Sequence, residues 1–292
     1  KVDLISGDES DQVVSAYGRG RAGFGMNRRV DRDGAWGIGA SPDRPVDTSV
    51  PVFRVDGPHG SPVALAFGYA CHATTLGAEF RQHSGDWVAH AKCRLRERYP
   101  EAMPLFLSGC AGDQAPFPRD RSSLARRYGD TMAVAVEAGA RAETTALDAS
   151  LGTGGDTVDL PVEAPDRATL EAGLDADDPG VRGRSRYLLA EYPDGVPDSY
   201  AYPIQRVEVG DVTLVGLAGE PVVEYADRLA AELDGAVWTA GYCHEYAGYV
   251  PTPEILQEGG YEGERWVENT PFPGRLDHSA EERIVDAVTG LD

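Results

Sequence analysis

Hydrophobic and polar positions follow two different periods along residues 52–146, which is typical of an α/β domain. The apolar runs 61–70 and 103–109 have the length and composition of buried strands. Residues 84–100 and 122–143 carry apolar side chains at helical spacing. This part of the chain therefore predicts two buried strands, each followed by a helix.

The second half has a similar pattern. Residues 202–219 alternate around a central Gly-Asp pair and predict a two-stranded hairpin. Residues 220–235 predict a helix with Pro221 in its first turn and Gly235 at its end. Residues 236–242 predict another strand.

Two stretches lack a clear period. Residues 160–200 are polar and rich in Asp, Pro and Gly, with a short helix expected at 183–193, so we interpret them as a connection or excursion within one core. Residues 243–275 are loop-like. The predicted fold is one α/β domain over residues 1–292, with a central mixed β-sheet flanked by helices. If the chain is a truncated piece, the missing part of this domain would precede residue 1.

Charge narrows the choice of partners. The 27 Lys and Arg and 48 Asp and Glu residues give a net charge of −21, which disfavours nucleic acid and anionic membrane surfaces. So acidic a surface is expected of a salt-adapted protein, and the alternative is a GC-rich genome that encodes Arg over Lys. No apolar run approaches the roughly 20 residues of a membrane-spanning helix, and oligomeric state is left open.

The cysteine pattern bears on the compartment. The four cysteines contain no C-x-x-C pair, which favours buried free thiols in a reducing compartment over a disulfide framework. A cytoplasmic location is therefore expected, and an extracellular one if a signal segment has been removed.

Polar residues gather where predicted strands run into loops. In open α/β sheets such strand ends are where sites are built. The residues at these four junctions are His72, Asp113, Glu220, His244, Glu245, Tyr246 and Tyr249. Each alone is ambiguous, since a single histidine at a strand end is more often a packing residue. Together they predict a metal pocket whose nitrogen and oxygen ligands suit zinc.

Arginines cluster near the N-terminus of this acidic chain, at Arg19, Arg21, Arg28 and Arg29. Such side chains bind a carboxylate ligand or form buried ion pairs. The sequence favours the ion pairs.

Five collinear segments resemble the neutral/alkaline (non-lysosomal) ceramidase catalytic domain and its prokaryotic relatives. They are "FGYACHATTLG", "HSGDW", "LFLSGCAGDQAP", "VEVGDVTLVGLAGEP" and "GYVPTPEILQEGGYEG". The resemblance runs from about residue 25 to 263. It implies an α/β fold, one zinc ion and hydrolysis of the amide bond of N-acyl sphingoid lipids.

The resemblance also implies roles for individual residues. His72 matches the zinc histidine of the family's N-x-x-x-H-x-T segment, Glu220 the glutamate of P-G-E, and Tyr249 the tyrosine of Y-V-T-T. Tyr261 matches a second tyrosine of the pocket. Asn27 and Arg28 match the family's N-R pair and, with Tyr246, are expected to contact the substrate.

The chain departs from the family at the second zinc histidine. In the family this residue lies in an upstream H-T-H-S-G-P segment, and this sequence begins after the corresponding point. Either the sequence is a truncated piece, or His83, Asp86 or His244 replaces that ligand.

A second departure concerns the family's serine nucleophile, in G-D-x-S-P-N. Here the segment reads "GDQAPF", with Ala115 at the serine position. We therefore expect hydrolysis by metal-bound water. Asp113 or Asp86 would act as general base or orient a histidine, and Tyr261 or Tyr249 would bind the oxyanion. Helix or turn capping is the structural alternative for the two aspartates.

Three functions stay open at this point. The first is a zinc hydrolase of an amide or ester bond in a small-molecule or lipid-like substrate, with a non-peptide C–N bond as the expected target. The second is a relative that binds a metal or ligand without turnover. The third is an N-acyl-lipid amidase. An apolar groove near His72 would favour the third, and an exposed polar pocket the first.

Overall fold

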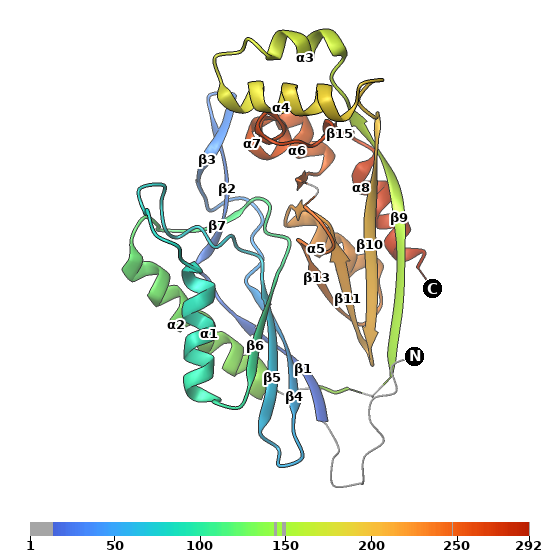
Figure 1. Cartoon of the computed structure of the whole chain (residues 1–292). Coiled ribbons are helices and arrows are strands. Elements are labelled where there is room, and N and C mark those ends of the chain that lie inside the picture. The colour runs from blue at the N-terminus through green and yellow to red at the C-terminus, as the bar shows by residue number, and fades with distance from the viewer. Residues whose placement is uncertain (1–13, 143–144, 148–149, 247, 292) are drawn as a thin grey trace.

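The computed structural model describes residues 14–142, 145–147, 150–246 and 248–291. At its centre two five-stranded sheets face each other (Figure 1). Their strand orders are β6-β5-β4-β1-β8 and β13-β11-β10-β9-β15. Both sheets are mixed, with β5–β6 and β11–β13 as their parallel pairs. The α/β class is confirmed, but the single central sheet that we expected is instead two sheets.

The strands of the two large sheets have the following bounds. The first sheet contains β1 (Val14–Arg21), β4 (Ser49–Asp56), β5 (Pro62–Tyr69), β6 (Met103–Ser108) and β8 (Thr145–Ala146). The second contains β9 (Leu151–Glu163), β10 (Ser199–Val209), β11 (Val212–Leu217), β13 (Ala236–Ala240) and β15 (Arg275–Leu276).

Two small sheets lie beside them and carry the residues of interest. One contains β2 (Gly25–Arg32), β3 (Ala35–Ser41) and β7 (Gln114–Pro116). The other is the parallel pair of β12 (Glu220–Pro221) and β14 (Tyr249–Val250).

Helices cover the outer faces of the sheets, which gives four layers (Figure 1). The helices are α1 (Asp86–Arg98), α2 (Ser122–Arg141), α3 (Arg167–Gly173), α4 (Pro179–Glu191), α5 (Glu224–Glu232), α6 (Pro253–Glu258), α7 (Gly260–Gly263), the 3-10 helix η2 (Arg265–Asn269) and α8 (Ala280–Thr289). Helices α1 and α2 pack on the first sheet, and α5 and α8 pack on the second.

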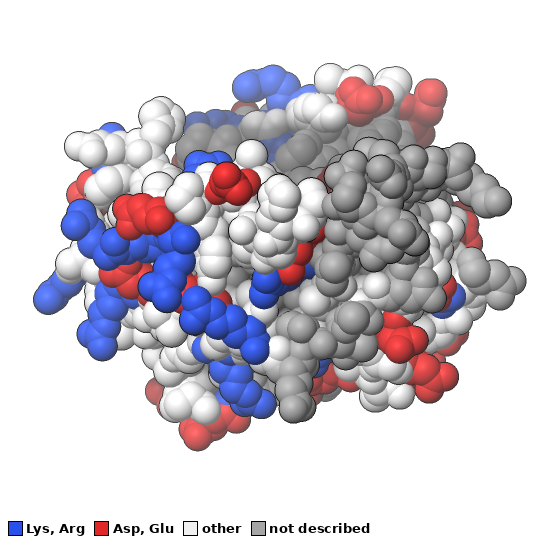
Figure 2. Space-filling view, turned by 90° about the horizontal axis from the view of Figure 1, so that it is seen from below, with Lys and Arg blue, Asp and Glu red and all other residues white. Residues whose placement is uncertain are grey.

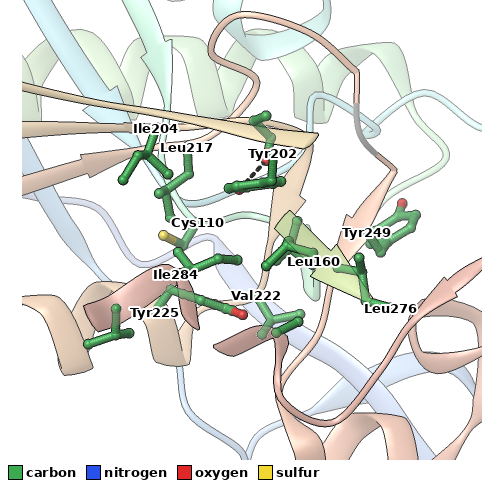
Figure 3. Packing of buried hydrophobic residues seen from close by; sticks show 14 of the residues in the cluster. Cys110, Leu160, Tyr202, Ile204, Leu217, Val222, Tyr225, Tyr249, Leu276 and Ile284 are labelled. Atoms are coloured by element: carbon green, nitrogen blue, oxygen red, sulfur yellow. Dashed lines mark hydrogen bonds between the residues drawn. The ribbon is translucent and has the colours of Figure 1, made fainter. Parts of the chain in front are cut away.

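Alternation along the strands explains how each sheet has two buried faces. Val212 and Leu214 of β11 point between the sheets, where they join Trp238 of β13. Val215 and Leu217 point to the opposite face, toward α5 and α8. Figure 3 shows this outer cluster close up, with Leu217, Tyr225 and Ile284 labelled; Tyr249 belongs to the same cluster.

Several predicted elements are confirmed. The helices expected at 84–100 and 122–143 are α1 and α2, and the hairpin at 202–219 is β10 and β11. The helix expected at 220–235 was placed wrongly at its start. Glu220 and Pro221 pair with Tyr249 and Val250, so α5 begins only at Glu224.

The two stretches without a period contain more structure than expected. Residues 243–275 include α6, α7 and η2, so the loop prediction was wrong there. Within 160–200, α3 and α4 connect the antiparallel strands β9 and β10. Helix α4 covers the short helix expected at 183–193.

The surface charge is unevenly distributed. Figure 2 shows Lys and Arg side chains gathered toward the side of the molecule where α1 and α2 lie. The exposed arginines of these helices are Arg94, Arg96, Arg98, Arg126, Arg127 and Arg141. Among the helices that the structure describes, none has the length and apolar character needed to cross a membrane.

A close approach between α2 and β1 yields a first prediction. A Cβ added at Gly20 would collide with the carbonyl oxygen of Ala135, a backbone atom of α2. We expect Gly20→Ala to lower the free energy of unfolding by about 2 kcal/mol or more, because the helix must shift outward. Gly23→Ala is the control, since nothing lies within 4 Å of its added Cβ. Urea unfolding measures both, and equal effects of the two substitutions would contradict this packing.

Candidate active site

Four chain segments meet below the layer formed by α3 and α4 (Figure 1). His72 follows β5, Gln114 begins β7, and Glu220 and Tyr249 face each other across the β12–β14 pair. The backbone carbonyl of Gln114 accepts a hydrogen bond from the His72 amide at 3.1 Å. We expected these strand ends to lie together, and His72, Glu220 and Tyr249 do so.

The centre of the site is a contact between His72 and Glu220. Their Nε2 and Oε2 atoms lie 2.8 Å apart, and the Tyr249 hydroxyl lies 3.5 Å from the same Nε2. On the other side of the ring, Nδ1 is 3.0 Å from the Gln114 carbonyl oxygen. Because a carbonyl only accepts, Nδ1 carries a proton. In the neutral ring Nε2 therefore directs a lone pair at Glu220.

Glu220 is held as a carboxylate. Burial alone would raise its pKa, but the contact with His72, which donates to Glu220 when Nε2 also carries a proton, and the hydrogen bonds from Tyr242 and Tyr249 outweigh burial and lower the pKa below its ordinary value. The Tyr246 hydroxyl also bonds to Glu220, and burial together with that carboxylate raises the pKa of Tyr246 to about 12. Tyr242 and Tyr246 are about half exposed, at 45% and 56%. Both phenols remain protonated donors near neutral pH and lie at the opening of the site.

Arg28 and Tyr261 lie behind Tyr249. A terminal nitrogen of Arg28 donates to the Tyr249 hydroxyl at 2.8 Å, and Nε donates to Glu262 at 2.8 Å. The Tyr261 ring is 5.5 Å from the Tyr249 ring and 5.9 Å from the Arg28 guanidinium. The neighbouring Arg29 also binds Glu262, so the predicted buried ion pairs are present for these two arginines.

Asp113 and Asn27 lie beneath the site rather than in it. Both are fully buried. The Asp113 carboxylate accepts from the Asn27 side-chain amide at 2.5 Å and from the Val223 backbone amide at 3.0 Å. Asn27 also donates to the carbonyl of Pro45. The roles that we expected, a general base for Asp113 and a substrate contact for Asn27, do not fit these positions, because both polar groups are already satisfied within the protein.

The side chain of Asp86 likewise forms hydrogen bonds within the protein. Its carboxylate accepts hydrogen bonds from the amides of Trp87 at 2.7 Å and Leu76 at 2.9 Å. It is buried and has a positive φ of 51° at the start of α1. These contacts hold the Leu76 loop against the start of α1, although they are not an N-cap, because that position is Gly85 and has no side-chain cap. They leave the expected catalytic role without support.

The substitute metal ligands do not join the centre. Among the residues that the structure describes, no third histidine, cysteine or carboxylate side chain joins His72 and Glu220 in a metal-binding group. His83 and His244 are both exposed. Of the ligands predicted from sequence, the structure brings together His72, Glu220 and Tyr249, and within the described part of the chain a metal pocket is not shown.

Three groups that contribute contacts to the site were not identified from the sequence. The Gln114 carbonyl orients the histidine, Tyr242 bonds to Glu220, and Glu262 binds both arginines. A backbone carbonyl has no sequence signal. Glu262 was visible within "GGYEG", but nothing in that segment indicated a buried carboxylate.

Known proteins support the resemblance. Over 68 residues the chain is 40% identical to the neutral ceramidase of Mycobacterium tuberculosis, a match that covers 21% of this chain and 11% of that protein. The crystal structure of neutral ceramidase from Pseudomonas aeruginosa superposes with a TM-score of 0.70 at 17% identity, over 95% of this chain and 51% of that one. A ceramidase complexed with C2 gives a TM-score of 0.68 at 15% identity, over 95% of this chain and 52% of that one.

The fold is therefore ceramidase-like, and the relationship is divergent and partial. No protein-family model matches the chain. The chain spans about half the length of the solved ceramidases. The resemblance inferred from the motifs is confirmed at this level.

A second carboxylate near the site gives a pH-dependent prediction. Burial and the nearby Asp113 raise the pKa of Glu224, at the start of α5, to about 7. Its Oε2 is buried and has no hydrogen-bond partner among the described residues. The folded state therefore binds a proton that the unfolded state releases near its ordinary value of 4.5. Stability contributed by this proton is present at low pH and is lost as the pH rises through about 7.

We expect Glu224→Gln to remove this loss and to stabilise the protein above pH 8 by at most about 3 kcal/mol. At pH 3.5, well below the unfolded pKa of 4.5, the pH-dependent difference between the variant and the parent should vanish. Glu232→Gln, at the exposed end of α5, is the control. Thermal unfolding across the pH range measures the effect, and a parent whose stability stays constant from pH 5 to 8 would contradict it.

Proposed function

We propose that the chain is a zinc-dependent hydrolase of an amide or ester bond that uses water in place of the ceramidase serine. The observation that carries the proposal is the contact between His72 Nε2 and Glu220 Oε2 at 2.8 Å. With Nδ1 protonated, two lone pairs face each other there unless a cation or a second proton lies between them. A second proton on Nε2 makes the contact a hydrogen-bonded ion pair, and a bound metal ion would displace that proton and accept both lone pairs.

The donor atoms suit zinc. His72, Glu220 and Tyr249 would hold the ion, and the Gln114 carbonyl fixes the tautomer of the histidine, as partners of metal-bound histidines do. Zinc, when bound, supplies a Lewis acid that polarises a carbonyl and makes water nucleophilic near neutral pH. Three protein ligands with an open position are the usual composition of a catalytic zinc site.

The position of the family serine supports water as the nucleophile. Ala115 is fully buried in β7, where its backbone pairs with Met26. It follows Gln114 directly, so a methyl group lies where the family has a hydroxyl. The motif match therefore supports water rather than a serine as the nucleophile.

Tyrosine hydroxyls would bind the substrate carbonyl. Tyr242 and Tyr246 lie at the exposed side of Glu220, and their raised pKa values keep them protonated. A phenol in this position donates a hydrogen bond to a carbonyl oxygen and to the oxyanion that develops from it.

The substrate is proposed to be a small acylated molecule, polar or lipid-like. The ceramidase relatives favour a lipid-like amide, whereas the exposed tyrosines favour a polar one. One pocket of the molecule is lined by Arg19, Asp47 and Trp238 among others, and another by Arg184 and Arg275 among others; neither includes His72 or Glu220. Neither of these two pockets is therefore the apolar groove beside His72 that would favour a long-chain amide.

Metal content tests the metal site directly. Protein purified without added metal should contain about one zinc ion per chain by plasma mass spectrometry, and His72→Ala should lose it. His59→Ala, in the exposed turn between β4 and β5, is the matched control and should retain the metal. An equal metal content in both variants, or none in the parent, would overturn the metal site.

Hydrolysis is tested on matched N-acyl and O-acyl substrates, each in a short water-soluble form and in a sphingoid form in micelles. We expect turnover of at least one of them to fall about 100-fold or more in Glu220→Gln and after chelation. A fully metallated protein that hydrolyses none would be a binding relative without turnover. Turnover of only the sphingoid amide would assign it as an N-acyl-lipid amidase.

A further inference from the structure

Two adjacent arginines of β2 approach the same carboxylate. In a regular strand, successive side chains point to opposite faces. The pairing of β2 with β3 shifts register between Asn27 and Arg29, which marks a bulge or irregularity at Arg28. Such an irregularity re-aims a side chain and is frequent next to active sites. Here it brings Arg28 and Arg29 to Glu262 together.

Both carboxylate oxygens of Glu262 accept hydrogen bonds from the two arginines. Oε1 accepts from Arg28 Nε and Oε2 from Arg29 at one terminal nitrogen, each at 2.8 Å. Side-chain exposure is 3% for Glu262, 7% for Arg28 and 1% for Arg29. Hydrogen bonds between charged groups at this depth are strong and directional. The three side chains Arg28, Arg29 and Glu262, called the clamp below, therefore have little freedom to rotate.

The clamp reaches the site through the Tyr249 side chain. With Nε held by Glu262, a terminal nitrogen of Arg28 is directed at the Tyr249 hydroxyl at 2.8 Å. The Tyr249 hydroxyl accepts this hydrogen bond. Its remaining lone pair and its proton therefore point away from Arg28, toward His72 Nε2 at 3.5 Å. The Arg28 guanidinium also lies 5.6 Å from the centroid of the Tyr249 ring.

We infer that Glu262 is a positioning residue: through Arg28 it fixes the direction in which the Tyr249 hydroxyl presents itself to His72 and Glu220. This inference rests on the proposed metal site. Partners that orient a ligand in this way typically change metal affinity about 10- to 100-fold when they are removed.

The neighbouring Glu258 provides a matched control. It binds Arg29 at 2.9 Å and Arg44 at 2.8 Å, and thus belongs to the same charged network. Among the described residues, its hydrogen bonds and ion pairs go to Arg29 and Arg44 and not to Arg28, so it lies outside the clamp. If the network only stabilises the fold, Glu258→Gln and Glu262→Gln should alter the site equally little.

Cobalt(II) in place of zinc gives a readout that does not depend on turnover, because its visible absorption reports the ligand geometry. The parent is titrated with cobalt alone. We expect Glu262→Gln to bind cobalt about 10- to 100-fold more weakly and with a changed visible spectrum. Glu258→Gln should keep the parent spectrum and affinity. In a Tyr249→Phe background, Glu262→Gln should produce no further change, because the residue acts through that hydroxyl.

The outcomes separate the two ideas. A parent without a cobalt signal overturns the proposed metal site, and with it this role of Glu262. A parent that binds cobalt while Glu262→Gln matches it overturns the positioning role alone, as does a further loss in the Tyr249→Phe background. If Glu262→Gln does not fold, Arg28→Lys replaces it. Lysine keeps the buried charge but cannot hold Glu262 and Tyr249 in one planar fork, so the same weakening is expected, and parent-like binding overturns the role.

Discussion

The buried carboxylate of Asp113 ties together the segments that carry the site. Its oxygens accept from Asn27 and from the backbone of Val223, and its own carbonyl accepts from the Arg28 amide at 2.8 Å. Asn27 and Val223 belong to β2 and to the entrance of α5. Burial raises the pKa of Asp113, and the hydrogen bonds act in the opposite direction. They offset part of the cost of removing the carboxylate from water. Asp113 thereby links β2, the start of β7 and the chain just after Glu220, the segments that carry Arg28, the Gln114 carbonyl and Glu220.

Sequence reasoning recovered the elements that depend on local pattern. Helices α1 and α2 and the β10–β11 hairpin follow from periodicity and turn residues, and no distant contact is needed to specify them. The pairing of Glu220 with Tyr249 joins positions 29 residues apart in two-residue strands, which are too short to carry a period. The face-to-face arrangement of two sheets was missed for a related reason: strands buried on both faces look the same in either arrangement.

The site itself was recovered in part. His72, Glu220 and Tyr249 lie together because polar residues at strand ends tend to meet, and the family motifs pointed to the same three. The expected roles of Asp86 and Asp113 stay predictions that their positions do not support, because a carboxylate that holds backbone amides looks the same in sequence as one that moves protons. Only the contacts to Leu76, Trp87 and Val223 distinguish the two.

Helix α4 lies in the stretch that we interpreted as a connection, yet it packs against η2. A Cβ at Gly180 of α4 would collide with the side chain of Asn269 of η2, and Arg184 donates to the carbonyls of Phe272 and Pro273. The segment thus supports the chain that immediately follows Glu262. Removing α4 would therefore also remove the contacts that hold residues 269–273, the stretch of chain a few residues beyond Glu262.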